Sequence, residues 1–178
     1  MPRFSLHAIG SDRPGIVAGV TGVLANEGCN IEDSRMTILC GQFAIMLIVE
    51  VPRRLSLERL EESFREVQES LDLSIIIRPL SEQPVVEFRG ESVAVSVHGA
   101  DRPGLVSTIA MRIAELGGNI IDLSTHRIEE NGAASYVMLL NIATSPTCTE
   151  EILSREIKAV SQLLGITCVV HAGGNELF

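Results

Sequence analysis

The tetrapeptide Asp12-Arg13-Pro14-Gly15 occurs a second time in this chain, as Asp101-Arg102-Pro103-Gly104. A glycine, an asparagine, an isoleucine and an aspartate follow each copy at the same spacing: Gly28, Asn30, Ile31 and Asp33 after the first, Gly117, Asn119, Ile120 and Asp122 after the second. Ten of the 24 positions from 12 to 35 are identical to the positions 89 residues later. This density of identities indicates that the chain contains two copies of one structural unit.

Both copies predict the same first strand and first helix. Apolar residues occupy every second position from 4 to 8 and from 93 to 97, which is the period of a half-buried strand. A helix follows in each copy, because Pro14 and Pro103 suit a first helical position and the next apolar residues recur on one helical face. These faces comprise Ile16, Val17, Val20, Val23 and Leu24 in the first copy and Leu105, Ile109, Ile113 and Leu116 in the second. Glycines at 28 and 117 mark the two helix ends.

Two further strands, a second helix and a last strand complete each copy. The strands expected at 31–39 and 43–51 meet at Cys40-Gly41, and those at 120–129 and 134–144 meet at Asn131-Gly132, a strong hairpin signal. The second helix is expected to open at Ser56 in one copy and at Thr149 in the other. The last strands cover 73–80 and 166–172.

The order strand, helix, strand, strand, helix, strand is typical of the ferredoxin-like α+β fold, in which both helices cover one face of an antiparallel sheet. We therefore expect two such domains in tandem, at 1–80 and 92–172, with a linker at 81–91 and a C-terminal tail at 173–178. Because this fold hosts unrelated functions, only the site residues can identify the function.

The composition of the 178-residue chain argues against several classes of protein. A net charge of −9 repels phosphate backbones and 3% aromatic residues leave few rings for stacking, so direct binding of nucleic acid is not expected. The longest apolar run, 43–49, is about a third of a membrane span, and we expect no secretory signal. We expect a soluble, cytoplasmic protein whose four cysteines are free thiols.

The side chains that usually carry catalysis or bind metals are scattered. His7, His98, His126 and His171 lie at no ligand spacing to one another, to a cysteine or to a carboxylate, so neither a metal nor another cofactor is expected. No combination of serine, histidine and aspartate, of cysteine and histidine, or of two carboxylates has a spacing that supports catalysis. The sequence therefore predicts a protein that is not an enzyme.

The repeated loop is the candidate ligand site. A glycine next to the proline at the helix start lets a ligand approach the backbone, where free amides and the helix dipole favour a carboxylate. Asp12 and Asp101 suit an ammonium group, and Asn30 and Asn119 offer a donor and an acceptor, so that together these groups suit both ends of a small zwitterion. Ordinary turn and capping chemistry is the better interpretation of a single copy. Two copies with the same residues favour a ligand site in at least one of them.

At these residues the sequence resembles the ACT domain family of small regulatory domains. The motif Asp-Arg-Pro-Gly-(Ile/Leu)-Val, with Gly-x-Asn-Ile downstream, matches both copies, so the resemblance covers essentially the whole chain. It implies that two such domains pair side by side into a continuous sheet and bind amino acids between the first loop of one and the second strand of the other. The ligand-binding residues that it implies are Asp12, Gly15, Ile16, Asn30 and Ile31, with Asp101, Gly104, Leu105, Asn119 and Ile120.

The sequence departs from part of this family in one place. Some serine-binding members have a histidine two residues before the position of Asp12 and an asparagine at that position, whereas this chain has Gly10 with Asp12 and Gly99 with Asp101. The departure argues against serine as the ligand. The resemblance implies glycine or a similar amino acid.

A tandem pair without a catalytic domain resembles accessory regulators that act on a DNA-binding protein rather than on DNA, and the acidic charge agrees with such an indirect role. The resemblance thus implies a non-catalytic, amino-acid-sensing regulator with a protein partner, which forms a homo-oligomer and contacts no membrane. Two alternatives stay open. One is a regulatory subunit of an amino-acid biosynthetic enzyme, and the other is a relative of formyltetrahydrofolate deformylase that lacks its catalytic domain.

Overall fold

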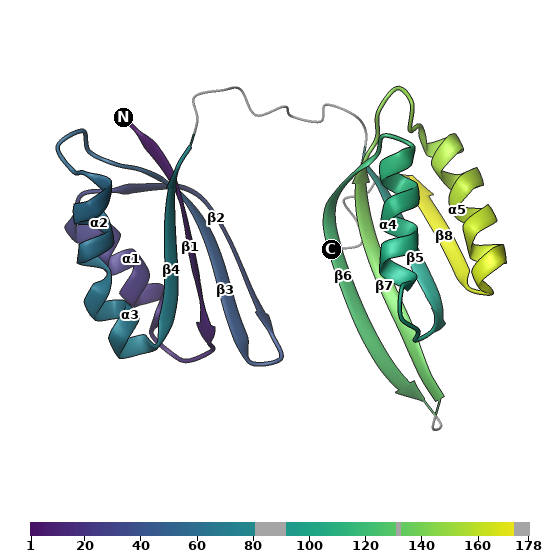
Figure 1. The fold of residues 1–178 in the computed structure, drawn as a ribbon, viewed down its shortest axis with the longest axis horizontal. Coiled ribbons are helices and arrows are strands. Elements are labelled where there is room, and N and C mark those ends of the chain that lie inside the picture. Colours follow the sequence, from purple (N-terminus) through teal and green to yellow (C-terminus); the bar gives the residue numbers. More distant parts are fainter. Residues whose placement is uncertain (81–91, 131–132, 173–178) are drawn as a thin grey trace. The chain divides into compact units, whose positions relative to one another are not determined.

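The structure, a computed structural model, describes residues 1–80, 92–130 and 133–172. The chain divides into two compact units, one within 1–84 and one within 85–178, and both contain the elements that the repeat predicts (Figure 1). The expected linker at 81–91, the turn Asn131-Gly132 and the expected tail at 173–178 lie outside the described residues.

The first unit is a four-stranded antiparallel sheet with its helices on one face (Figure 1). The strands lie side by side in the order β2 (Asn30–Leu39), β3 (Gln42–Glu50), β1 (Arg3–Ser11) and β4 (Leu73–Pro79). The helices are α1 (Ile16–Asn26), α2 (Leu57–Ser63) and α3 (Arg65–Leu71). The strands β2 and β4 are therefore the edges of this sheet.

The second unit repeats this arrangement. Its strands lie in the order β6 (Asn119–Glu130), β7 (Ala133–Ala143), β5 (Ser92–Ala100) and β8 (Thr167–Ala172), and its helices are α4 (Leu105–Glu115) and α5 (Glu150–Leu164). All its neighbouring strands are antiparallel. The prediction of two ferredoxin-like α+β domains is confirmed.

Alternate residues of the central strands form the core of each unit with one face of each helix. In β1, Leu6 and Ala8 are buried under the helices, whereas His7 lies on the opposite face of the sheet in register with Met46 and Ile76. In β5, Val93, Val95 and Val97 are buried in the same way, but Ala94 and Ser96 on the opposite face of the sheet are buried too. The buried faces of the first helices are Ile16, Val20 and Leu24 in α1 and Leu105, Ile109 and Ile113 in α4. These residues belong to the apolar stripes that the sequence predicts, except that Val17 of the predicted stripe in α1 is 42% exposed.

The second helix of the first unit differs from the single helix expected from Ser56 onward. It is divided into α2 and α3 at Phe64, whose N–H donates to the carbonyl of Glu61, three residues back, at 3.2 Å. This tighter turn still carries the ring of Phe64 into the core, where it is fully buried. In the second unit, α5 runs over 15 residues without a break.

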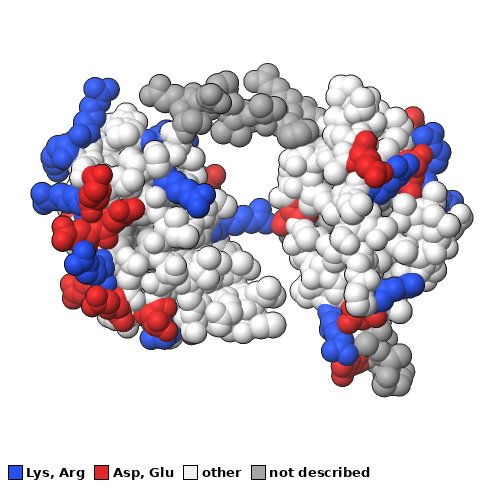
Figure 2. All heavy atoms as spheres, in the orientation of Figure 1, with Lys and Arg blue, Asp and Glu red and all other residues white. Residues whose placement is uncertain are grey.

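Charged side chains of both signs gather over the α2–α3 side of the first unit (Figure 2). They are exposed and comprise Glu58, Arg59, Glu61, Glu62, Arg65, Glu66 and Glu69. A mixed row of this kind on the outer face of a helix is typical of a solvated surface. We assign it no ligand.

The edge strand β2 is exposed along its whole length. Its apolar side chains include Met36, Ile38 and Leu39, with exposed fractions of 47%, 51% and 68%. A long edge strand leaves a row of backbone N–H and C=O groups that can pair with another strand. The end of β2 that carries these side chains is also the end nearest the repeated loop, as shown below.

Candidate functional site

The first helix of each unit begins without a side-chain cap. Gly15 and Gly104 occupy the N-cap positions of α1 and α4 with φ angles of 96° and 88°, in the left-handed region that favours glycine. Among the residues that the structure describes, no side chain caps the first turn of either helix with a hydrogen bond. By contrast, Ser56 and Thr149 cap α2 and α5 through their hydroxyl oxygens, as the sequence predicts. The first-turn amides of α1 and α4 are therefore available to an anionic group.

Open space surrounds the first of these glycines. A Cβ built on Gly15 would meet no described atom within 4 Å, and one built on Gly104 would meet Ser107 Oγ at 3.9 Å. The side chains of Ile16 and Leu105 are buried in the two cores, so these candidate residues offer a ligand only their backbone N–H groups. The loop thus combines free amides with room for a small carboxylate.

The β2–β3 hairpin holds the loop that precedes α1. The backbone N–H of Asp12 donates a hydrogen bond to the carbonyl of Gly41 at 2.8 Å. Cys40 and Gly41 form the hairpin turn with φ angles of 49° and 76°, the two positive values that a type I′ turn requires. Asp12 therefore lies beside the C-terminal end of β2.

The two aspartates of the repeated motif have different surroundings. Asp12 is exposed, and its carboxylate has neither an ion pair nor a hydrogen bond among the residues that the structure describes. Asp101 Oδ2 lies 3.4 Å from Nε of Arg127, which projects from β6. Arg127 also pairs with Glu129 through Nη2 at 3.2 Å. The carboxylate of Asp101 thus already has the guanidinium group of Arg127 as its partner.

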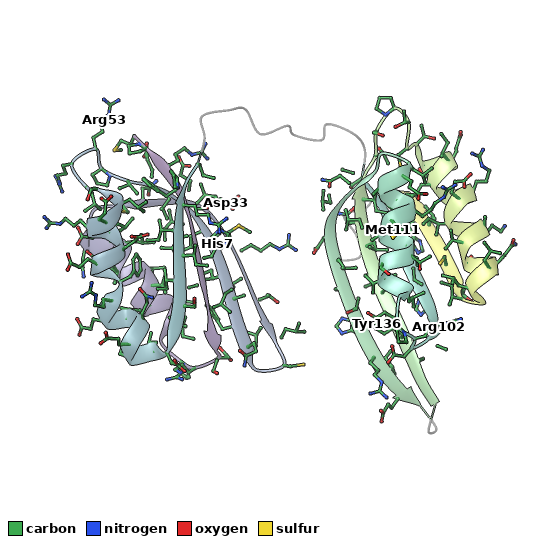
Figure 3. All side chains as sticks on the ribbon, viewed as in Figure 1. His7, Asp33, Arg53, Arg102, Met111 and Tyr136 are labelled. Atoms are coloured by element: carbon green, nitrogen blue, oxygen red, sulfur yellow. The ribbon has the colours of Figure 1, made fainter. Side chains whose placement is uncertain are left out.

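The two arginines of the motif also differ. Arg102, labelled in Figure 3, donates a hydrogen bond to the carbonyl of Leu164 at the end of α5. The last carbonyls of a helix have no partner within the helix, so Arg102 stabilises the C-terminus of α5. Arg13 makes no such contact within the described ranges. The sequence did not reveal this structural role, because a capping contact over 62 residues has no local signal.

Asn30 and Asn119 are the first residues of β2 and β6, and both are exposed. The left-handed positions belong instead to Gly28 and Gly117, with φ angles of 73° and 82°, which end α1 and α4 in Schellman motifs. The asparagines themselves therefore do not have the left-handed backbone that a tight turn after these helices requires. With Ile31, Asn30 lines a shallow groove of about 530 Å³ between α1 and β2.

The structure separates Asn30 from Asp12 within the first unit. Asn30 begins β2 and Asp12 lies beside the other end, so the length of a ten-residue strand, about 30 Å, lies between them. One amino acid cannot contact both residues of the same unit. Asp12 with Gly15, and Asn30 with Ile31, are therefore two separate candidate contacts.

A side chain has no room at Gly10 or Gly99, two residues before the motif aspartates. A Cβ on Gly10 would lie 2.7 Å from Leu73 Cδ2 and 2.8 Å from the carbonyl oxygen of Asp72. A Cβ on Gly99 would lie 2.4 Å from Ile166 Cγ2. The histidine of the serine-binding members is therefore incompatible with the way β1 and β5 pack against the segments that lead into β4 and β8.

The repeated pair Asp33 and Asp122 has a local structural role. Each follows an irregularity in the register of its strand, between Ile31 and Asp33 in β2 and at the same place in β6. Each also accepts a hydrogen bond at Oδ1 from the next residue, from Ser34 N at 2.7 Å and from Leu123 N at 2.9 Å. The carboxylates thus satisfy backbone groups where the strand is irregular.

The thiols are poor candidates for a reactive site, with the exception of the exposed Cys40. Burial raises the pKa of the Cys29, Cys148 and Cys168 thiols above their ordinary value, and nearby Glu27 adds to the effect at Cys29. A raised pKa keeps these thiols protonated near neutral pH, which lowers their reactivity.

Residues 1–80, 92–130 and 133–172 contain neither a metal-binding group nor a helix that could cross a membrane. No histidines, cysteines and carboxylates gather there in a group that could bind a metal ion. The helices within these ranges are also too short or too polar to cross a membrane.

Comparison with known proteins identifies the kind of domain. Family models of the ACT domain match residues 4–77 and 93–147. The glycine cleavage system transcriptional repressor of Escherichia coli K12 is 30% identical over 82% of this chain and 76% of its own length. A UPF0237 protein of Methanopyrus kandleri is 38% identical over 44% of this chain and 88% of its own length.

Solved structures share the fold over nearly the whole chain. An unknown protein from Galdieria sulphuraria has a TM-score of 0.78 at 25% identity, covering 96% of this chain and 98% of that one. A putative glycine cleavage system transcriptional repressor has a TM-score of 0.72 at 22% identity, covering 96% of both chains. At that identity, the second likeness shows the fold alone.

Proposed function

Because the chain belongs to the ACT domain family and is similar to the glycine cleavage system transcriptional repressor, we propose that it senses an amino acid and controls transcription through a protein partner. The family and the relatives make it a regulatory protein with two ACT domains. The observation that supports a sensor most strongly is the start of α1, where the first-turn amides, the open space at Gly15 and the unpaired carboxylate of Asp12 lie in one loop.

The chemistry of this loop suits a small zwitterion. The amides and the positive end of the helix dipole attract the α-carboxylate, and Asp12 attracts the α-ammonium group. Glycine is the first amino acid to test, because the repressor that this chain resembles is named for glycine cleavage. Asn30 and Ile31 are too distant from Asp12 of their own unit to bind the same ligand. We therefore propose that they contact a ligand held by the loop of another ACT domain.

A protein partner fits this chain better than DNA. The net charge of −9 opposes binding to a phosphate backbone, whereas the exposed edge of β2 offers apolar side chains and backbone groups for pairing. ACT domains typically oligomerise, and we propose that this chain forms a homo-oligomer as well. The chain alone should leave duplex DNA unretarded in a gel at physiological salt, and a retarded band that weakens with added salt would contradict an indirect mode of action.

A thermal-shift screen of the twenty amino acids tests the sensing function. Glycine or another small amino acid should raise the melting temperature, since a ligand at a hundred times its Kd stabilises the native state by about 2.7 kcal/mol. Asp12→Asn should reduce this shift. The control is Glu62→Gln, which removes one negative charge from the exposed face of α2 and should leave the shift unchanged. If none of the twenty amino acids shifts the parent protein, the sensing function is wrong.

A further inference from the structure

We propose that the two repeated loops differ in their affinity for an amino acid. Arg127 forms an ion pair with Asp101 in the second unit. The carboxylate of Asp12 in the first unit is therefore the one that accepts the ammonium group of the ligand. This inference rests on the proposed sensing function and assigns it to one of the two copies. The sequence motif is the same in both units, and the difference comes from a residue outside the motif.

Arg127 and Ile38 occupy the same position in their respective sheets. Ile38 is in register with Phe43 of β3, and Arg127 is in register with Tyr136 of β7, the matching ring of the second unit. Each residue therefore lies near the end of its edge strand, on the side of the repeated loop. In the second unit this position brings Arg127 Nε to within 3.4 Å of Asp101 Oδ2.

The charge at this position decides what the aspartate can bind. Arg127 neutralises part of the charge of Asp101 and repels a second cation, so an ammonium group has to displace it. Ile38 carries no charge, and Asp12 keeps its carboxylate without a partner among the described residues. The ion pair of Arg127 is exposed, and pairs of this kind change an equilibrium by about fivefold at most. We therefore expect the second loop to bind an amino acid more weakly than the first, by up to about fivefold.

A second contact holds the loop of Asp101 in place. Arg102 donates to the carbonyl of Leu164, which ties this loop to the end of α5. The corresponding Arg13 is exposed and makes no such bond in the described part of the first unit. The first loop can thus adjust around a ligand without losing a capping contact.

The test exchanges the two side chains in the full chain. Glycine is titrated into ¹⁵N-labelled protein, and the amide signals of Gly15 and Gly104 report the two loops separately. In the parent, Gly15 should respond at a lower glycine concentration than Gly104, by a factor of up to about five. Arg127→Ile should move the response of Gly104 to a lower glycine concentration, closer to that of Gly15, and Ile38→Arg should weaken the response of Gly15 by up to about fivefold.

Two control variants separate charge at this position from other effects. Arg127→Lys keeps a cation beside Asp101 and should leave the response of Gly104 weak. Leu39→Arg adds the same charge as Ile38→Arg one residue further along β2, on the opposite face of the sheet, and should leave the response of Gly15 unchanged. Arg127, Ile38 and Leu39 are 58%, 51% and 68% exposed, so these exchanges leave the cores intact.

The outcomes distinguish this inference from the proposed function. If Gly15 and Gly104 of the parent respond at the same glycine concentration, or if Arg127→Ile leaves Gly104 unchanged, the inference is wrong and the sensing function stands. If neither signal moves in any variant with glycine or with any of the other nineteen amino acids, both are wrong.

Discussion

The backbone N–H of Asp12 donates a hydrogen bond to the carbonyl of Gly41 across 2.8 Å, which joins the loop before α1 to the turn of the β2–β3 hairpin. The acceptor belongs to a residue with a positive φ of 76°, and a Cβ there would meet no described atom within 4 Å. The candidate loop is therefore joined to a turn that needs a left-handed backbone.

Gly41→Ala should destabilise the protein, and Gly22→Ala should stabilise it. Alanine at 41 is forced into the left-handed region, which costs about 1–2 kcal/mol. Gly22 lies inside α1, and a Cβ there would meet no described atom within 4 Å, so alanine gains about 0.5–1 kcal/mol of helix propensity. Urea unfolding measures both changes, and a loss of stability in both variants would contradict the structure.

Removing the amide of Asn30 or Asn119 should weaken amino-acid binding without unfolding the protein. Both side chains are exposed and have no hydrogen-bond partner within the described ranges, so alanine removes no contact of the unliganded fold. A lost hydrogen bond to a ligand costs about 0.5–1.5 kcal/mol. Calorimetry should show weaker binding in at least one of Asn30→Ala and Asn119→Ala. If both variants bind like the parent, the asparagines have no part in the site.

Gly99→Ala should destabilise the second unit because its Cβ would lie 2.4 Å from Ile166 Cγ2. Overpacking of this kind costs about 1–3 kcal/mol. Ile166→Ala removes the clashing methyl group, so the double variant should lose less stability than the sum of the two single variants. Chemical denaturation of the four proteins measures this coupling. Strict additivity would show that the two residues are not in contact.

Acid should destabilise the parent more than Glu156→Gln. The hydrogen bond from Arg112 and, next in importance, that from Arg155 hold the pKa of Glu156 below its ordinary value of 4.5. A carboxyl group whose pKa is lowered by folding stabilises the native state above its unfolded-state pKa, and this contribution disappears as the pH falls through the folded-state pKa. Melting temperatures between about pH 3 and pH 7 should therefore converge at the acid end. A constant difference between the two proteins would contradict this.

Cys40 should react with iodoacetamide before the other three thiols. It is exposed in the hairpin turn, whereas burial raises the pKa of Cys29, Cys148 and Cys168 and keeps the thiolate fraction low. Mass spectrometry of peptides after brief labelling near neutral pH measures the order. Equally rapid labelling of Cys29 would show that the groove between α1 and β2 exposes it more than the structure does.

Local patterns in the sequence determined the units and their elements. The repeated tetrapeptide marked two copies, the period-2 pattern of Phe4, Leu6 and Ala8 predicted a central strand, and the hydroxyls of Ser56 and Thr149 marked helix starts. Such features are readable because each depends on residues within a few positions of one another. The break of the second helix at Phe64 was not readable, since a glutamate-rich segment with one buried ring suits a continuous helix equally well.

Only the tertiary structure decided which residues of the motif lie close together in space. It located Asp12 at the far end of β2 from Asn30, brought Arg127 to Asp101 and left no room for a side chain at Gly10. Each of these relationships depends on which strands are neighbours and in what register, and strand pairing joins residues that are distant in the chain. The identity of the two motif copies is therefore a property of the sequence, and the difference between their surroundings is a property of the fold.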